Sequence, residues 1–254
     1  MNTVLTDVRD GVCTITLNRP QRLNAMNEEL VADFDRALEA ADRDPAVAVI
    51  LLCGAGKAFC AGDDLKEFEA QTRDAETTRR HLGRIQDTAR KMFYGEKPIV
   101  GAARGWAAGG GFEWLINCDF VIMGEGTRCF FPEVSLGFIV TGGVTALLPR
   151  LVGLQKARAM ILFGEKFTAP ELLALGLVHA VVPDASVDEE GRRLAQRIAA
   201  LPAGPVRSLK RVMNRALGLD FESVLELERD AVLQGFLDPA TAGRVRQAAL
   251  RRQS

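Results

Sequence analysis

Residues 47–67 read VAVILLCGAGKAFCAGDDLKE, an apolar run followed by a glycine-rich turn and the start of a helix. The apolar part, 47–52, lies between Asp44-Pro45 and Gly54, which is typical of a strand covered on both faces. Similar short runs recur at 99–102 and 120–123, and residues 12–17 alternate β-branched and polar residues as a strand does, with helical segments between these strands. This alternation predicts an α/β protein with parallel strand pairing.

Helical patterns complete the organisation of the chain. Asn27 is a candidate N-cap before a helix with apolar residues at helical spacing. From residue 141 strands nearly vanish, apart from an apolar run at 177–182. Helices are predicted near 142–149, 153–163, 169–174, 186–200, 203–217 and 222–235. The residue pattern changes near residue 200, which predicts a core over 1–200 and a helical appendage over 201–254.

Length and composition exclude several classes of protein. The 254 residues are enough for one sizeable core with a small appendage. A formal net charge of -1 gives no overall field that favours nucleic acid or an anionic membrane as a partner. The five cysteines are scattered without a C-x-x-C pair, which predicts buried thiols and no metal site. With no leader pattern and no long apolar run, we expect a cytoplasmic protein.

Two glycine-rich segments fail as nucleotide-binding motifs. Gly54-Ala55-Gly56-Lys57 ends like a P-loop, but Ala58 replaces the Ser or Thr that would bind magnesium. Leu51 also stands where the first glycine of that motif belongs. The glycines of 105–111 fit the dinucleotide-binding pattern in no register. We therefore expect neither an NTP site nor a Rossmann site.

Two segments, 59–67 and 109–113, can instead offer backbone N–H groups to an oxyanion. Residues 59–67 place a tight turn before a helix, and Asp64 with Glu67 forms a capping-box pattern. Gly109-Gly110-Gly111 leaves the main chain open just before Glu113, at the start of another helix. Taken singly, the first segment also fits an ordinary strand-to-helix turn, and the second fits close helix packing.

A second carboxylate follows in an apolar setting. Glu133 comes after Phe130-Phe131-Pro132, and desolvation there raises a glutamate pKa towards the range useful for proton transfer. A surface turn is the alternative interpretation of this segment. Two backbone anion sites and two glutamates nevertheless match one task, which is to stabilise an enolate while protons move at adjacent carbons.

Five segments, in this order, resemble the enoyl-CoA hydratase/isomerase family, the crotonases. They are Leu17–Pro20 with Asn24-Ala25, 57–67, 105–113, Pro132-Glu133 with Leu136-Gly137, and 148–153. The resemblance covers roughly residues 3 to 218. It implies a crotonase-like spiral of ββα units with a helical C-terminal region that forms trimers, which often pair into hexamers. It also implies acyl-CoA thioester substrates and no cofactor beyond the coenzyme A of the substrate.

The resemblance also assigns roles by position. Asp63 and Gly110 match the positions whose N–H groups hold the thioester oxygen. Glu113 and Glu133 match the two catalytic glutamates of the hydratases, which hold water and exchange a proton with the α-carbon. The positions implied to bind substrate and coenzyme A are Arg22, Ala61, Asp63, Asp64, Leu65, Lys66, Gly109 and Gly110.

Two departures from the family pattern concern the substrate. Position 63 usually holds a small residue, so we expect the Asp63 side chain to point outward, away from the developing enolate. After Leu136-Gly137 the hydratases usually carry a proline-containing glycine-rich loop, whereas this chain has 138–144, FIVTGGV. We expect Thr141 to cap the next helix and residues 138–140 to reshape the wall of the acyl pocket.

Several functions remain compatible with the sequence. The leading hypothesis is a 2-enoyl-CoA hydratase that forms a 3-hydroxyacyl-CoA. An enoyl-CoA isomerase, or a dehydratase or lyase acting on a related acyl-CoA, uses the same oxyanion chemistry. A non-catalytic or RNA-binding member of the fold is a different class, which the charge balance and the two glutamates argue against.

Overall fold

The computed structural model describes residues 2–251, in two compact units that divide between Ala200 and Leu201. The first unit contains the strands β1 (Val4–Arg9), β2 (Val12–Leu17), β3 (Val49–Gly54), β4 (Ile99–Ala103), β5 (Trp106–Ala108), β6 (Phe120–Gly124), β7 (Arg128–Phe130), β8 (Phe167–Thr168) and β9 (Ala180–Val182). Its helices are α1 (Glu28–Arg43), α2 (Phe68–Gln71), α3 (Ala75–Tyr94), α4 (Gly110–Ile116), α5 (Val144–Val152), α6 (Leu154–Phe163), α7 (Ala169–Ala174) and α8 (Val187–Ala199).

A six-stranded sheet organises this unit, in the order β1-β2-β3-β4-β6-β9. Pairing is parallel from β2 onward, with Val12 opposite Val49 and Ile50 opposite Ile99. The predicted strands and their parallel pairing are therefore confirmed. β1 pairs antiparallel with β2 at the edge and was not predicted. Five of its six residues are exposed, so it lacks the apolar run that marks the central strands.

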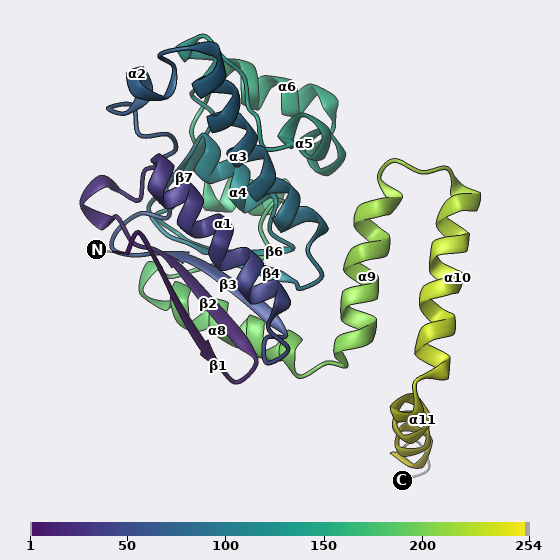
Figure 1. The fold of residues 1–254 in the computed structure, drawn as a ribbon. Coiled ribbons are helices and arrows are strands. Elements are labelled where there is room, and N and C mark those ends of the chain that lie inside the picture. Colours follow the sequence, from purple (N-terminus) through teal and green to yellow (C-terminus); the bar gives the residue numbers. More distant parts are fainter. Residues whose placement is uncertain (1, 252–254) are drawn as a thin grey trace. The chain divides into compact units, whose positions relative to one another are not determined.

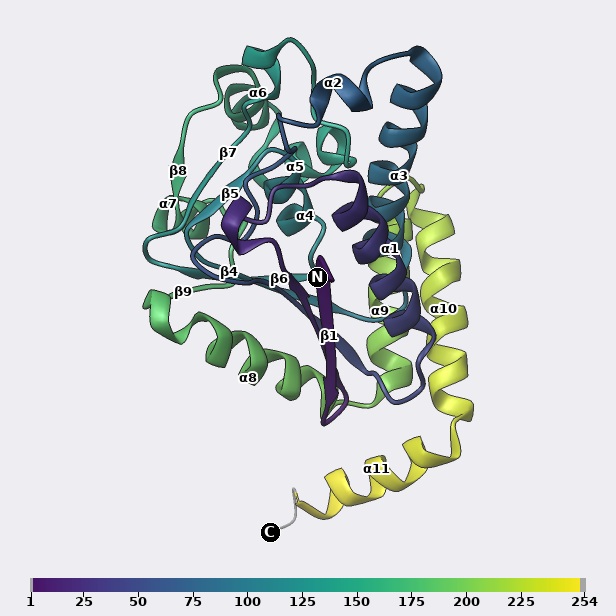
Figure 2. The ribbon, with the colours of Figure 1, turned by 60° about the vertical axis from the view of Figure 1, so that its left-hand side comes forward.

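Helices cover both faces of this sheet, α8 on one and α1 with α3 on the other (Figures 1 and 2). Asn27 caps α1 as predicted, because its side chain accepts a hydrogen bond from the N–H of Leu30 at 3.0 Å. The buried face of α1 carries Leu30, Phe34 and Leu38. These apolar side chains join those of the strands in one core.

A second, three-stranded sheet in the order β5-β7-β8 positions the candidate site. β5 and β7 are parallel, with Ala108 opposite Phe130, so both strands end at the same edge. β8 runs antiparallel to β7. These strands have two or three residues each, too few for a periodic pattern in the sequence.

The second unit contains α9 (Ala203–Ala216), α10 (Phe221–Leu237) and α11 (Pro239–Arg251). α9 and α10 lie side by side and antiparallel, and α11 follows α10 after a sharp change of direction (Figure 1). The helices predicted over 142–235 are all present, whereas α11 was not predicted. Between Asn2 and Arg251, no helix is long and apolar enough to cross a membrane.

Candidate active site

The segment that follows β3 and the strand β5 run side by side and form one wall of the site. Cys60 and Ala107 form a parallel bridge. The N–H of Cys60 donates to the C=O of Trp106, and the N–H of Ala108 donates to the C=O of Cys60, both at 3.0 Å. Because both segments run in the same direction, Asp63 and Gly110 follow on the same side of the bridge.

The N–H groups of Asp63 and Gly110 are left without an acceptor. The backbone of Met26 forms hydrogen bonds with the residues before and after Asp63. Its N–H donates to the C=O of Gly62 at 2.8 Å, and its C=O accepts from the N–H of Asp64 at 2.9 Å. Gly110 opens α4, where first-turn N–H groups have no partner within the helix. Within residues 2–251 neither N–H donates to a protein acceptor, so both can bind an oxygen of a ligand.

Glu113 lies one turn into α4 and is 3% exposed. Its Oε2 accepts hydrogen bonds from the N–H groups of Gly142 and, at 3.1 Å, Thr141. Burial raises the pKa of Glu113 to about 7. The two N–H donors lower this pKa, and the nearby charge of Asp63 raises it. The carboxyl group is therefore both fixed in place and able to change protonation near neutral pH.

Glu133 begins the short 3-10 helix η2 (Glu133–Leu136), directly after β7 and Pro132, and is 5% exposed. A Cβ on Gly109, whose φ is +50°, would lie 2.7 Å from Oε1 of Glu133, so only glycine fits there. Oε2 of Glu133 is buried without a hydrogen-bond partner. Burial first, and then the charges of Glu113 and Asp63, raise the pKa of Glu133 to about 7.

Aromatic packing fixes the two glutamates relative to each other. Phe112, next to Glu113, stacks on Phe131, two residues before Glu133, with ring centroids 4.8 Å apart. On the other side of α4, Trp114 packs against Phe34 of α1 at 4.7 Å. α4 is thus anchored both to the segment that carries Glu133 and to the core.

The side chain of Asp63 does not point outward, and that prediction is wrong. Oδ1 of Asp63 is buried without a hydrogen-bond partner, and burial raises the pKa of the group. Its charge acts on both Glu113 and Glu133, so the three carboxyl groups share one region. His81 of α3 is the opposing charge that acts on Asp63.

The capping box predicted at Asp64 and Glu67 is also wrong. α2 begins only at Phe68, and Glu67 makes no side-chain cap. Asp64 is 7% exposed, and its Oδ2 pairs with the Arg19 guanidinium at 3.0 Å. Arg19 therefore pairs with the carboxylate that the sequence assigned to the helix terminus, and the ion pair ties this loop to the turn after β2.

The other residues expected to bind coenzyme A fall into two groups. Ala61 is tied to the turn after β2, since its N–H donates to the C=O of Leu23 at 3.0 Å, next to Arg22. The side chains of Arg22, Leu65 and Lys66 are exposed on these two adjacent segments. The structure thus places the segments that carry these residues side by side, and their contact with coenzyme A stays a prediction.

The loop 138–144 contributes more to the site than the sequence indicated. Thr141 does not cap α5, because the helix begins at Val144 with Gly143 as its N-cap. The N–H of Thr141 donates to Glu113. Phe138 stacks on Phe68 of α2 with ring centroids 6.3 Å apart, while Val140 is buried in the core. The signal that sequence reasoning missed is the Gly142-Gly143 pair, where a bare backbone can approach a carboxylate.

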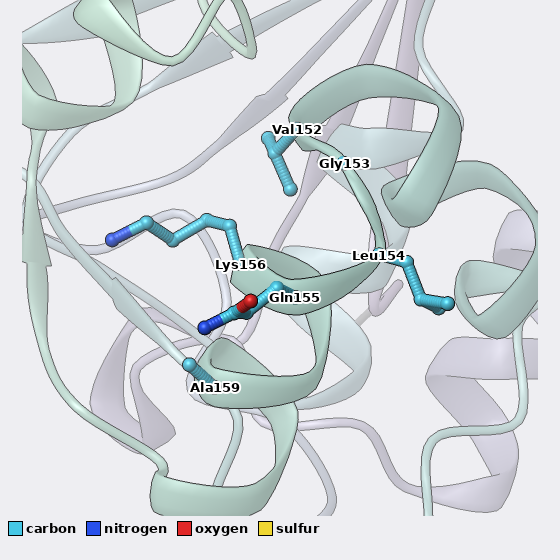
Figure 3. Close-up of a pocket in the computed structure, with 6 residues that line it drawn as sticks. All are labelled: Val152, Gly153, Leu154, Gln155, Lys156 and Ala159. Carbon is cyan, nitrogen blue, oxygen red and sulfur yellow. The ribbon is translucent and has the colours of Figure 1, made fainter.

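A separate hollow of about 520 Å³ lies at the start of α6 (Figure 3). Its lining contains none of the predicted site residues and consists of Val152, Gly153, Leu154, Gln155, Lys156 and Ala159. The two glutamates and the N–H groups of Asp63 and Gly110 lie elsewhere, around the edge shared by β5 and β7.

Comparisons with known proteins indicate one family. The model of the enoyl-CoA hydratase/isomerase family matches residues 7–239. A probable enoyl-CoA hydratase of Rhizobium meliloti is 38% identical over 89% of this chain and 87% of its own. A 1,2-epoxyphenylacetyl-CoA isomerase of Escherichia coli is 33% identical, over 91% and 88%. The crystal structure of an enoyl-CoA hydratase of Mycobacterium smegmatis superposes with a TM-score of 0.91 at 30% identity, covering 98% of this chain and 96% of that one.

Proposed function

The chain belongs to the enoyl-CoA hydratase/isomerase family, and we propose that it catalyses the reversible addition of water to a 2-enoyl-CoA. The observation that carries the proposal is that two buried glutamates lie near two backbone N–H groups that have no acceptor within residues 2–251. Burial also raises the pKa of each glutamate to about 7. One carboxyl group can accept a proton while the other donates one, at a site that also binds a developing oxyanion.

The proposed reaction begins at the thioester carbonyl. The N–H groups of Asp63 and Gly110 hold its oxygen and stabilise the enolate, where one such donor contributes about 3 to 4 kcal/mol. Glu113, fixed by Thr141 and Gly142, takes a proton from water as the hydroxyl adds to C3. Glu133, with a free carboxyl oxygen, delivers a proton to C2. One water is consumed and the two carboxyl groups exchange protonation states.

Crotonyl-CoA tests this function directly. We expect the purified protein to remove the conjugated-enone absorbance and to form a product one water heavier by mass analysis. Loss of absorbance without the added water would reject hydration. Binding of crotonyl-CoA without turnover would also reject this substrate while leaving the oxyanion site intact.

An enoyl-CoA isomerase is the second candidate, because the family model that matches residues 7–239 covers hydratases and isomerases alike. Isomerisation needs one base that moves a proton between carbons and no added water. Incubation with a 3-enoyl-CoA distinguishes the two reactions. A conjugated product of unchanged mass supports the isomerase, whereas a hydratase without isomerase activity leaves the 3-enoyl-CoA unchanged.

The coenzyme A moiety is proposed to lie along the exposed surface of Arg22, Leu65 and Lys66, where two cations can meet its phosphates. Protonation and hydration need no further cofactor in this scheme, and a cytoplasmic location stays a prediction.

We also propose a homotrimer, or a dimer of trimers, built through the helices of 201–254. Phe221, Phe236 and Leu237 of α10 are exposed there, and light scattering on the purified protein measures the assembly.

A further inference from the structure

The side chain of Asn117 joins two parts of the candidate site that are distant in sequence. Asn117 is the C-cap of α4 and is 6% exposed. Its Nδ2 donates to the C=O of Glu113 and to the C=O of Gly142, both at 2.9 Å. One amide nitrogen thus holds the helix that carries Glu113 and the turn that faces it.

The same turn holds the Glu113 carboxylate from its other side. The N–H groups of Thr141 and Gly142 donate to Oε2 of Glu113, and a Cβ on Gly142 would lie 2.9 Å from that oxygen. Glu113 and Asn117 are four residues apart and therefore project from one face of α4. Gly142 consequently offers its N–H to Glu113 and its C=O to Asn117, which fixes the orientation of the turn at two points.

From this closed set of contacts we infer that Asn117 is a positioning residue for Glu113, acting through the turn at Thr141 and Gly142. This inference rests on the proposed function for its kinetic consequence but not for its structural one. Asn117 touches neither substrate nor reacting atoms in the proposed scheme. Its role is to keep two N–H donors directed at a buried carboxylate, and such donors favour the ionised form.

Other groups also act on Glu113, and they are common to every variant considered below. The charge of Asp63 acts on Glu113, and the charges of Glu113 and Glu133 act on each other. The thiol of Cys60 is buried against Gly111, at the start of α4. Since Asn117 is uncharged, replacing it changes the hydrogen bonds around Glu113 without adding or removing a charge.

Three variants separate positioning from general packing. Asn117→Leu is close in size and removes both hydrogen bonds. Asn117→Ser is milder: its hydroxyl can still donate to the C=O four residues earlier but is too short to reach Gly142. Thr127→Val is the matched control, because Thr127 is fully buried and donates one side-chain hydrogen bond, to the C=O of Ala103 at 3.1 Å, away from the glutamates.

The test is the pKa of Glu113, read by carbon-13 NMR of the labelled carboxyl group with Glu113→Gln to assign the signal. We expect both Asn117 variants to raise this pKa by at least about half a pH unit, and Thr127→Val to leave it unchanged. With crotonyl-CoA, we expect kcat to fall about tenfold in the Asn117 variants while KM stays constant. The acidic limb of the pH profile of kcat should move to higher pH by as much as the pKa of Glu113 rises.

An unchanged Glu113 pKa in a folded Asn117→Ser protein would overturn the inference and leave Asn117 a packing residue. A fall in thermal stability alone, equal to that of Thr127→Val, would overturn it in the same way. Because the NMR measurement needs no turnover, it tests the role of Asn117 even if crotonyl-CoA is not hydrated. Failure of the proposed function and failure of this inference are therefore distinguishable.

Discussion

The two glutamates of the site are buried to a similar degree but are held in opposite ways. Glu113 sits in a helix, and its carboxylate accepts N–H groups from the turn at Thr141 and Gly142. Glu133 sits in a single 3-10 turn, and its Oε2 has no hydrogen-bond partner. One carboxyl group is thus fixed and the other has a free oxygen. The difference agrees with the division of labour proposed above, in which Glu113 orients water and Glu133 exchanges a proton with carbon.

Removing either carboxyl group is expected to have the largest effect. Glu113→Gln and Glu133→Gln each keep the shape of the side chain but cannot transfer the proton, so kcat for crotonyl-CoA should fall by about a hundred- to ten-thousand-fold. The measurement is initial rate by absorbance, with thioester binding as the control for folding. Wild-type hydration in either variant contradicts the assignment of that glutamate.

Glu133→Gln should also change how stability depends on pH. Burial raises the pKa of Glu133 from 4.5 to about 7, so between these values the folded protein binds more protons than the unfolded chain and loses stability as pH rises. Replacing the carboxyl group removes a cost of up to about 3 kcal/mol above pH 7. Denaturant unfolding at pH 8 should show the gain, and at pH 4 it should be nearly absent. An equal effect at both pH values would refute the raised pKa.

Gly109→Ala sharpens the contrast because it places a Cβ against the carboxyl group of Glu133 while both glutamates stay in the chain. The added Cβ would lie 2.7 Å from Oε1 of Glu133, and φ at Gly109 is +50°. Displacing the carboxyl group by about 1 Å should lower kcat about a hundredfold. Gly83→Ala is the control, since a Cβ at Gly83 meets no heavy atom within 4 Å. Full activity in Gly109→Ala would show that the position of Glu133 is not critical.

Asp63→Asn should have the smallest effect, and it acts on both glutamates together. The charge of Asp63 raises the pKa of Glu113 and of Glu133, and its backbone N–H is kept in the variant. Without that charge the pH optimum of hydration should move towards acid by up to about one pH unit. Asp87→Asn, on the exposed side of α3, is the control. An unchanged pH optimum of hydration would show that the charge of Asp63 does not act on the two glutamates during the reaction.

The sequence predicted the main sheet well because its strands are unbroken apolar runs, as in β3 and β4. It also predicted a helix start at Gly109–Gly111 with Glu113 in its first turn, whereas the burial of Glu113 is a finding of the structure. The pairing of Asp64 with Arg19 could not be predicted, because the partners are 45 residues apart and only the fold brings them together. The inward side chain of Asp63 and the contact of Gly142 with Glu113 are tertiary features of the same kind.

Hydrogen exchange at the α-carbon tests the division of labour most directly. Butyryl-CoA has an α-proton but no hydroxyl group to lose, so in D2O it reports proton transfer at C2 without hydration. The account predicts that the wild type and Glu113→Gln incorporate deuterium, detected by mass analysis, while Glu133→Gln does not. Exchange by Glu133→Gln at the wild-type rate, or its loss only in Glu113→Gln, would contradict the assignment of the carbon-directed proton to Glu133.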